Sequence, residues 1–379
     1  MRNAALVPLV VAVAALCLGV SCGSQRARAQ AEPRLLRLPS PTGPAAVGTR
    51  SLLLVDHRRR DPFDPRHRVR RLMVQLWYPA EVGSPTASYL PRKVGRLLAQ
   101  EYRLPPSTFA RVRTNSIAGG RPTREGGLHP LIIFSPGYGV IRDFYSTLFE
   151  ELASHGFAVL ALDHTYETEA VELPNGTVVR RRLPANALQR NHPTSSRLIL
   201  KMMRTRVADV RFLLRRLPWI NRQAAAGTID LGRIGIFGHS LGGLTSAAIA
   251  GNDPGVRAAA DLDGSIYGPE TRRVASQPFL IMTERGDGTM TRYWSRLRRP
   301  RFFVQIDGTR HFNFSDWTVL GPWLRATHRR LPAIGPIAPA RALMIVRAYL
   351  LAFFERYVAD QPSSLLDQPS PFPEVKVKR

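Results

Sequence analysis

The stretch Arg233-Ile-Gly-Ile-Phe-Gly-His-Ser-Leu-Gly-Gly243 decides how this chain of 379 residues is interpreted. It contains a G-x-S-x-G pentapeptide around Ser240, and an apolar, β-prone run precedes that pentapeptide. A run of small, helix-prone residues from Leu244 to Ala250 follows it. A G-x-S-x-G sequence between a strand and a helix is typical of a sharp turn that holds its serine at the end of a sheet. Glycines on either side lack a Cβ and let the strand and the helix approach closely.

Around this turn, strand-like and helix-like segments alternate from Leu131 onward. The expected strands are 131–134, 157–162, 256–262, 279–282 and 301–306, and the expected helices are 143–155, 198–217, 292–297 and 340–358. Strands at 52–55 and 71–78 open the pattern, and residues 80–127 look irregular apart from a short helix near 94–102. This alternation predicts an α/β fold with a mostly parallel central sheet and helices on both faces. Ligands of such sheets bind at the carboxyl ends of the strands.

A histidine that could activate the serine follows the last expected strand. A serine hydroxyl becomes a nucleophile only beside a base, and the base needs an orienting acid. In folds with this serine turn the chain order is serine, acid, histidine, and the histidines after Ser240 are His311 and His328. His311 follows strand 301–306 and is the expected base, whereas His328 lies in a polar, surface-like stretch.

Three carboxylates compete for the role of the acid. Asp263 ends strand 256–262, with Asp261 on the same side of that strand by its period of two,. Glu284 and Asp287 follow strand 279–282 and are the alternative acids. Sequence spacing does not separate these candidates.

Backbone amides near the serine are candidates for an oxyanion hole, which stabilises negative charge that develops during acyl transfer. One candidate is the N–H of Leu241, directly after the serine. The other is the N–H of Tyr138 in the loop Ser135-Pro-Gly-Tyr-Gly139, which follows the first buried strand and whose glycines allow a close backbone approach. No ligand cluster for a metal or an organic cofactor is apparent in the sequence, so none is expected.

The chain begins like an exported protein. Arg2 is followed by an apolar run of fifteen residues from Leu6 to Val20, too short for a comfortable membrane span and typical of a secretory signal,. Cleavage after Ala27-Arg-Ala29 would remove residues 1–29. Alternatively, Gly19-Val-Ser-Cys22 resembles a lipobox, which would remove residues 1–21 and place a lipid on Cys22. Both alternatives predict a secreted or cell-envelope protein, and no cysteine follows Cys22 in the sequence.

The remaining chain divides by composition. The Pro-, Gly- and Arg-rich composition of residues 30–48 predicts a disordered linker,. We expect residues 49–360 to form the catalytic domain and residues 361–379 to form a C-terminal tail. Within the domain, residues 165–196 break the alternation of strands and helices and predict an inserted excursion or lid.

The net charge of +26 comes almost entirely from arginine, because lysine occurs only at Lys93, Lys201, Lys376 and Lys378. Arginines are spread along the whole chain without a nucleic-acid-binding motif, which argues against a nucleic-acid partner and favours a compositional bias,. Attraction to an anionic membrane surface remains an expectation of this charge.

Several stretches together resemble the platelet-activating factor acetylhydrolases, also called lipoprotein-associated phospholipases, and their bacterial relatives. The matching stretches are Leu76-Trp-Tyr-Pro79, Phe134-Ser-Pro-Gly-Tyr-Gly139, Leu152-Ala-Ser-His-Gly-Phe157, Gly238-His-Ser-Leu-Gly-Gly243, Leu262-Asp-Gly264 and His311-Phe-Asn-Phe-Ser-Asp316. The resemblance implies an α/β-hydrolase fold, with Asp263 as the acid, His311 as the base, and the Tyr138 and Leu241 amides as the oxyanion hole. Pro136, where many members carry His, and the insert 165–196 depart from the family pattern.

We therefore expect a secreted or envelope-anchored serine esterase that forms an acyl-enzyme. The resemblance implies short or oxidised acyl groups of phospholipids, or other small esters, as substrates. One alternative is a cutinase-like polyester hydrolase, which would more naturally use Asp287 as the acid. Another is a non-catalytic, lipid-binding envelope lipoprotein, against which the intact Ser240 and His311 argue.

Overall fold

The computed structural model describes residues 34–184, 187–188, 195–324 and 331–379, so the expected signal peptide and His328 lie outside it. Its strands are β1 (Leu36–Arg37), β2 (Ala46–Arg60), β3 (Val69–Ala80), β4 (Thr86–Ser88), β5 (Val112–Ala118), β6 (His129–Ser135), β7 (Ala158–Leu162), β8 (Ala170–Glu172), β9 (Val178–Arg180), β10 (Ile229–His239), β11 (Val256–Leu262), β12 (Phe279–Thr283), β13 (Arg301–Ile306) and β14 (Val375–Lys378). Its α-helices are α1 (Arg92–Glu101), α2 (Ser146–Ser154), α3 (Ser195–Ala224), α4 (Leu241–Ala250), α5 (Gly288–Arg296), α6 (Trp317–Leu324) and α7 (Pro339–Tyr357).

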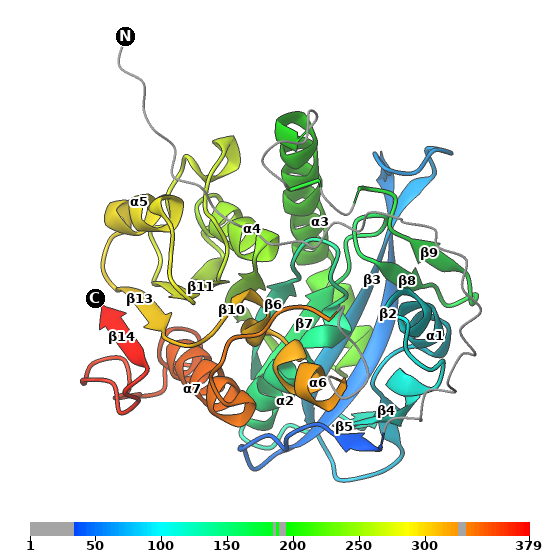
Figure 1. The fold of residues 1–379 in the computed structure, drawn as a ribbon, viewed down its shortest axis with the longest axis horizontal. Coiled ribbons are helices and arrows are strands. Elements are labelled where there is room, and N and C mark those ends of the chain that lie inside the picture. Colours follow the sequence, from blue (N-terminus) through cyan, green and yellow to red (C-terminus); the bar gives the residue numbers. More distant parts are fainter. Residues whose placement is uncertain (1–33, 185–186, 189–194, 325–330) are drawn as a thin grey trace, which may run out of the picture.

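A 12-stranded sheet forms the centre of the molecule (Figure 1). Its order is β1-β5-β2-β3-β7-β6-β10-β11-β12-β13-β14, with β4 paired to β5, while β8 and β9 form a separate hairpin. The strands from β7 to β13 in this order run parallel to one another, whereas β3 and β14 are antiparallel to their neighbours. The predicted α/β fold with a mostly parallel sheet is confirmed.

Helices cover both faces of this sheet because the residues of its central strands are apolar on both sides. In β6, Ile132 and Phe134 belong to a core that includes residues of α2, α6 and α7. The alternate residues Leu131 and Ile133 belong to a second core that includes residues of α3, α4 and α5 (Figure 1). The layers fix the central strands from both sides, and the carboxyl ends of those strands meet along one edge.

The prediction of a disordered linker over 30–48 is wrong for the part that the structure describes. Leu36–Arg37 form β1, which pairs in parallel with β5, and Leu38 is 1% exposed in the core. Residues 46–48 already belong to β2. A two-residue strand has no period that a sequence pattern could reveal, and its partner β5 lies in the part of the chain that looked irregular.

The expected tail and insert are also more ordered than the sequence indicates. β14 lies within 361–379 and closes one edge of the sheet against β13. In the insert 165–196, residues 165–168 are buried and β8 and β9 form a hairpin, although residues 185–186 and 189–194 lie outside the described part. β14 is formed by its pairing with the distant β13, and β8 and β9 are only three residues each, so local composition does not reveal these strands.

Candidate active site

Ser240 forms the turn between β10, which ends at His239, and α4, which begins at Leu241. It has a φ of 56° and a ψ of −121°, a backbone conformation that a residue with a side chain rarely adopts. Such strain persists only where the surroundings enforce it, and it is concentrated at functional sites. The Ser240 amide donates to the carbonyl oxygen of Leu262 at 2.8 Å, which ties the turn to the end of β11. The residue stays partly exposed at the carboxyl edge of the sheet.

The glycines that flank Ser240 are required by close backbone contacts. A Cβ on Gly238 would overlap the backbone of Gly242. A Cβ on Gly242 would overlap the carbonyl oxygen of Ser135 at the end of β6. The turn therefore packs α4 directly on two strands, as the G-x-S-x-G pattern predicts.

His311 and Asp263 meet at the same edge of the sheet. The Nδ1 atom of His311, just after β13, lies 2.7 Å from Oδ2 of Asp263, just after β11. The other carboxylate oxygen accepts hydrogen bonds from Thr283 Oγ1 at 2.6 Å and from the Glu284 amide at 3.1 Å. Burial raises the pKa of Asp263, but the hydrogen bond and charge of His311, together with the hydrogen bonds from Thr283 and Glu284, hold this pKa below its usual value. The carboxylate therefore stays ionised and fixes the orientation of the imidazole.

The other candidate acids are engaged elsewhere. Asp287 is the N-cap of α5 and accepts hydrogen bonds from the amides of Thr289 and Met290 at 2.7 and 2.8 Å. Glu284 contributes its backbone amide to Asp263, and burial together with the charge of Asp263 raises the pKa of its carboxyl. Asp261 accepts from the Gly264 amide at 2.9 Å beneath the serine turn. The structure brings Asp263, and none of these three, into contact with His311.

The loop after β6 passes beside the serine. A Cβ placed on Gly137 would lie 3.5 Å from the Cβ of Ser240. Within the described residues, the amides of Tyr138 and Leu241 have no hydrogen-bond acceptor. Both amides predicted for the oxyanion hole are thus available to a ligand.

Arg206 of α3 donates hydrogen bonds to the carbonyl side of this loop. Its Nη1 donates to the carbonyl oxygen of Pro136 at 2.7 Å and to Ser135 Oγ at 3.2 Å, and its Nη2 donates to the Gly137 carbonyl at 3.4 Å. In a trans peptide the carbonyl and the following N–H point in opposite directions. Because the carbonyls of Pro136 and Gly137 face Arg206, the amides of Gly137 and Tyr138 point away from α3.

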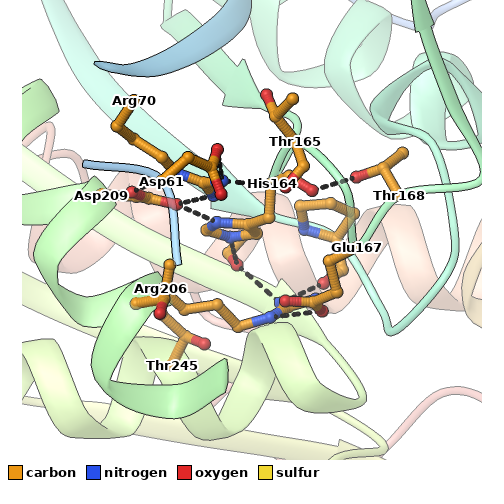
Figure 2. Close-up of polar contacts among 12 residues, drawn as sticks. Asp61, Arg70, His164, Thr165, Glu167, Thr168, Arg206, Asp209 and Thr245 are labelled. Carbon is orange, nitrogen blue, oxygen red and sulfur yellow. Dashed lines mark hydrogen bonds and ion pairs between the residues drawn. The ribbon is translucent and has the colours of Figure 1, made fainter. Parts of the chain in front are cut away.

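A buried chain of polar groups stands behind Arg206 (Figure 2). His164 lies 3.0 Å from Ser135 Oγ through Nε2 and 2.9 Å from Asp209 through Nδ1. Burial, with the charge of Arg206, lowers the pKa of His164, so a neutral ring can donate to Asp209 and accept from Ser135,. Arg70 also donates to Asp209, at 2.6 Å. Ser135, His164 and Asp209 are each 0% exposed, so this second Ser-His-Asp set supports the loop and does not reach a substrate.

A second chain links the loop to the segment of His311. The Gly137 amide donates to Tyr145 Oη at 3.2 Å, and this hydroxyl lies 2.8 Å from His239 Nδ1. His239 Nε2 lies 2.9 Å from the carbonyl oxygen of His311. Burial, with the charge of His311, lowers the pKa of His239 to about 3, so the ring is neutral near pH 7. A neutral ring that donates to this carbonyl accepts a hydrogen bond from the Tyr145 hydroxyl, and these contacts join the two loops across the site.

These supporting residues were not predicted from the sequence, although a signal for some of them is present. Arg206 and Asp209 lie at helical spacing from Met202, Met203 and Leu213, all of which are buried. Charged residues on the apolar face of a helix indicate a buried polar network. Within the described residues, no His, Cys, Asp and Glu side chains are grouped so that they could hold a metal ion. None of the helices described is long and apolar enough to cross a membrane.

A parallel sheet whose central strand ends in a strained serine turn, beside a paired histidine and aspartate, defines an α/β hydrolase. The model of the family described as "Platelet-activating factor acetylhydrolase, isoform II" matches residues 34–175 and 219–366. The chain belongs to this family, as its motifs indicate. Residues 176–218, which include Arg206 and Asp209, lie outside the matched segments.

Individual relatives are esterases as well. A probable 1-alkyl-2-acetylglycerophosphocholine esterase of Arthroderma benhamiae is 25% identical over 382 residues, which cover 90% of this chain and 94% of the relative. The cutinase est2 of Thermobifida alba is 25% identical over 62% of this chain and 70% of its own length. A solved ferulic acid esterase from Streptomyces cinnamoneus is 31% identical with a TM-score of 0.76, covering 91% of this chain and 100% of the esterase. The protein is accordingly a carboxylic ester hydrolase.

Proposed function

We propose that this protein is an exported serine esterase that cleaves short or oxidised acyl groups from phospholipids through an acyl-enzyme. The observation that carries the proposal is the contact between His311 Nδ1 and Asp263 Oδ2 at 2.7 Å, beside the strained turn of Ser240. This contact leaves Nε2 of His311 as the nitrogen that exchanges a proton with the serine.

In the acylation step, Ser240 Oγ attacks the ester carbonyl while His311 takes the hydroxyl proton. Asp263 stays ionised and stabilises the imidazolium that forms. The negative oxygen of the tetrahedral intermediate accepts hydrogen bonds from the Tyr138 and Leu241 amides. His311 then protonates the leaving alcohol, and the acyl group remains on Ser240.

In the deacylation step, a water molecule attacks the acyl carbonyl and gives its proton to His311. The second tetrahedral intermediate uses the same amides. Its collapse breaks the bond to Ser240 Oγ, which recovers its proton from His311, and releases the carboxylic acid. The free enzyme is restored, and one water molecule is consumed in each turnover.

The phospholipid substrate is supported by the family and by the relative from Arthroderma benhamiae, whose name states an alkylacetylglycerophosphocholine esterase. The similarity to a cutinase and a ferulic acid esterase makes other esters the second candidate. The cutinase-like hypothesis would more naturally use Asp287, whereas His311 contacts Asp263. This pairing favours the phospholipid candidate.

Turnover of p-nitrophenyl esters from acetate to palmitate, with oxidised phosphatidylcholine alongside, tests the proposal. We expect the shortest esters and the oxidised phospholipid to be cleaved best. Preference for long unmodified chains or for a polyester film would favour the cutinase-like alternative. A protein that cleaves none of these esters and does not react with a fluorophosphonate would favour the lipid-binding alternative.

Export is part of the proposal and is supported by the apolar run over 6–20 and its two processing sites. The N-terminal mass of the mature protein decides between them. A chain that begins at Gln30 would indicate a freely secreted enzyme, and a diacylglyceryl group on Cys22 would indicate an anchored one. An unprocessed N-terminus in the cytoplasm would contradict export.

A further inference from the structure

Helix α3 carries a stripe of basic residues on its outer side. Arg197, Lys201, Arg204, Arg211 and Arg215 follow one another at intervals of 3, 4 or 7 residues. Residues at these intervals lie on one face of an α-helix. Arg206, which belongs to the buried network, points inward from the same helix.

The stripe lines two adjoining surface hollows of about 510 and 600 Å³. Arg59 at the end of β2 lines both hollows and its neighbour Arg60 lines the first, whereas Arg272 and Arg273 line the second. Figure 1 shows the corresponding arrangement, with α3 between the β2–β3 ribbon and α4. The hollows share Arg59 and Arg204, so they form one basic groove.

The charge of this basic groove exceeds what the composition explains. Half of the residues that line it are Arg or Lys, against 54 of 379 in the whole chain. Glu270 pairs with Arg204 at 3.4 Å, and Asp56 and Asp209 pair with Arg59 at 2.6 and 2.9 Å.

Among the described residues, no carboxylate forms an ion pair with the basic residues Arg60, Arg211, Arg215, Arg272 and Arg273, and all of these are exposed. The groove therefore carries a cluster of guanidinium groups that repel one another unless an anion is bound. Guanidinium groups bind phosphate oxygens with paired N–H donors.

We propose that the basic groove binds phosphate-bearing headgroups of an anionic phospholipid bilayer and holds the enzyme at the surface that contains its substrates. The choice of a lipid as the source of the phosphate rests on the proposed function. The volumes of the hollows lie within the range of about 300–1,000 Å³ typical of sites for small ligands. The stripe lies in residues 176–218, outside the segments that the family model matches.

The groove begins at the edge of the sheet that carries Ser240 and continues along the outer helices. Arg59 and Arg60 end β2, which runs parallel to β7 through the antiparallel β3 between them, so this end of the groove lies toward the carboxyl edge of the sheet. Arg206 of α3 contacts the loop beside Ser240 at that edge. At the other end of the groove, the Arg273 backbone packs against Gly251 at the C-terminal end of α4, the helix that begins next to Ser240.

Vesicle sedimentation over a sodium chloride series tests the proposal, with phosphatidylcholine vesicles compared with phosphatidylcholine–phosphatidylglycerol vesicles. All proteins carry Cys22→Ala, so that no lipid on this residue contributes. The groove variant combines Arg211→Gln, Arg215→Gln and Arg273→Gln. The control combines Arg92→Gln, Arg96→Gln and Arg298→Gln, which removes the same charge from exposed positions on α1 and before β13.

We expect the groove variant to lose affinity for the anionic vesicles by about fivefold per removed charge, on the order of 100-fold in all, and to depend less on salt. The control should lose no more than about threefold, because its charges lie away from the bound surface. Equal losses in the two variants would overturn the proposal and indicate a general effect of net charge. It would also be overturned if the groove variant lost binding to duplex DNA but kept binding to the vesicles.

Hydrolysis of soluble p-nitrophenyl acetate separates this proposal from the proposed function. Both variants should cleave this ester at the rate of the parent protein, because neither alters a residue of the site. A parent protein that binds anionic vesicles through the groove but cleaves no ester would support the groove and contradict the esterase function. A parent protein that cleaves the ester but binds both kinds of vesicle equally at all salt concentrations would contradict the groove alone.

Discussion

The guanidinium of Arg206 donates a hydrogen bond of 2.7 Å to the carbonyl oxygen of Pro136, 70 residues earlier in the chain. Arg206 is 1% exposed and also forms an ion pair with Glu167, which is equally buried. The contact joins the middle of α3 to the loop that supplies the Tyr138 amide. It turns a flexible Pro-Gly sequence into a defined arrangement before any substrate arrives, which is the condition for electrostatic stabilisation of a transition state.

Arg206→Lys is expected to lower kcat for p-nitrophenyl acetate by about 10- to 100-fold, with a much smaller change in KM. A lysine offers a single ammonium group in place of a planar fork, so it cannot hold the carbonyls of Pro136 and Gly137 together. A loss of one oxyanion donor costs about 10²–10³-fold in kcat, and a misplaced donor should cost less. Steady-state kinetics and the thermal unfolding midpoint are measured together.

Arg216→Lys provides a matched control on the same helix, because Arg216 stacks on the Trp219 ring, 4.8 Å from its centroid, away from the loop. It should retain kcat. A positioning role for Arg206 is contradicted if Arg206→Lys keeps kcat, or if the two variants lose activity in proportion to a common loss of stability.

Ser240→Ala is expected to lower ester hydrolysis by about 10⁴-fold or more and to abolish fluorophosphonate labelling, because the members of a triad act as a unit. The fold should persist, since alanine is smaller than serine in the same turn. Labelling of intact protein followed by peptide mapping identifies the reactive serine. Labelling that persists in the variant would assign the nucleophile to another residue.

Asp263→Asn is expected to lower kcat at least ~10²-fold more than Asp287→Asn does. An asparagine beside His311 favours the wrong imidazole tautomer. Asp287→Asn is a suitable control because asparagine is also a good N-cap, so α5 should remain intact,. Kinetics of both variants on the same ester give the ranking, and the reverse order would move the acid to the loop after β12.

The contact between His311 and Asp263 could be predicted from the order of the strands. Both residues follow strands that have strong apolar runs, and parallel strands bring their carboxyl ends to one edge,. The acid was left open because three carboxylates follow neighbouring strands, and only the contact between His311 and Asp263 separates them.

The buried network was not predicted because its members come from distant segments. Ser135, His164 and Asp209 lie on β6, after β7 and on α3, and each is unremarkable alone. An arginine-rich composition also hides Arg206 among exposed arginines of the same helix. The strands β1, β4 and β14 were missed for a related reason, since each is short and is formed only by its pairing with another segment.

Treatment with EDTA is expected to leave the activity unchanged. Proton transfer by His311 and the amides of Tyr138 and Leu241 supply what a metal would otherwise supply in ester hydrolysis. Turnover of p-nitrophenyl acetate is measured after dialysis against the chelator. Loss of turnover that calcium or zinc restores would contradict a mechanism in which the chain's own residues suffice.

Asp316 anchors the His311 segment to α2, and its titration provides a test of that packing. It is 0% exposed and accepts hydrogen bonds from Thr147 Oγ1 at 2.6 Å, from the Thr147 amide at 3.1 Å and from Tyr89 Oη at 2.9 Å. Burial is the largest influence on this group and raises the pKa of Asp316 to about 6. In the unfolded chain the group titrates near its ordinary value of 3.8.

Between these two pKa values the folded protein holds a proton that the unfolded chain has released. The contribution of Asp316 to the free energy of unfolding is therefore full below pH ~4, falls as the pH rises to ~6, and is constant above. Asp316→Asn cannot ionise, so the difference in stability between the parent and the variant should shrink by up to ~3 kcal/mol over this interval. Urea unfolding of both proteins at pH ~4 and ~8 measures the change, and other titrating groups cancel because both proteins contain them. A difference that stays constant, or that grows with pH, would show that Asp316 is ionised in the folded state.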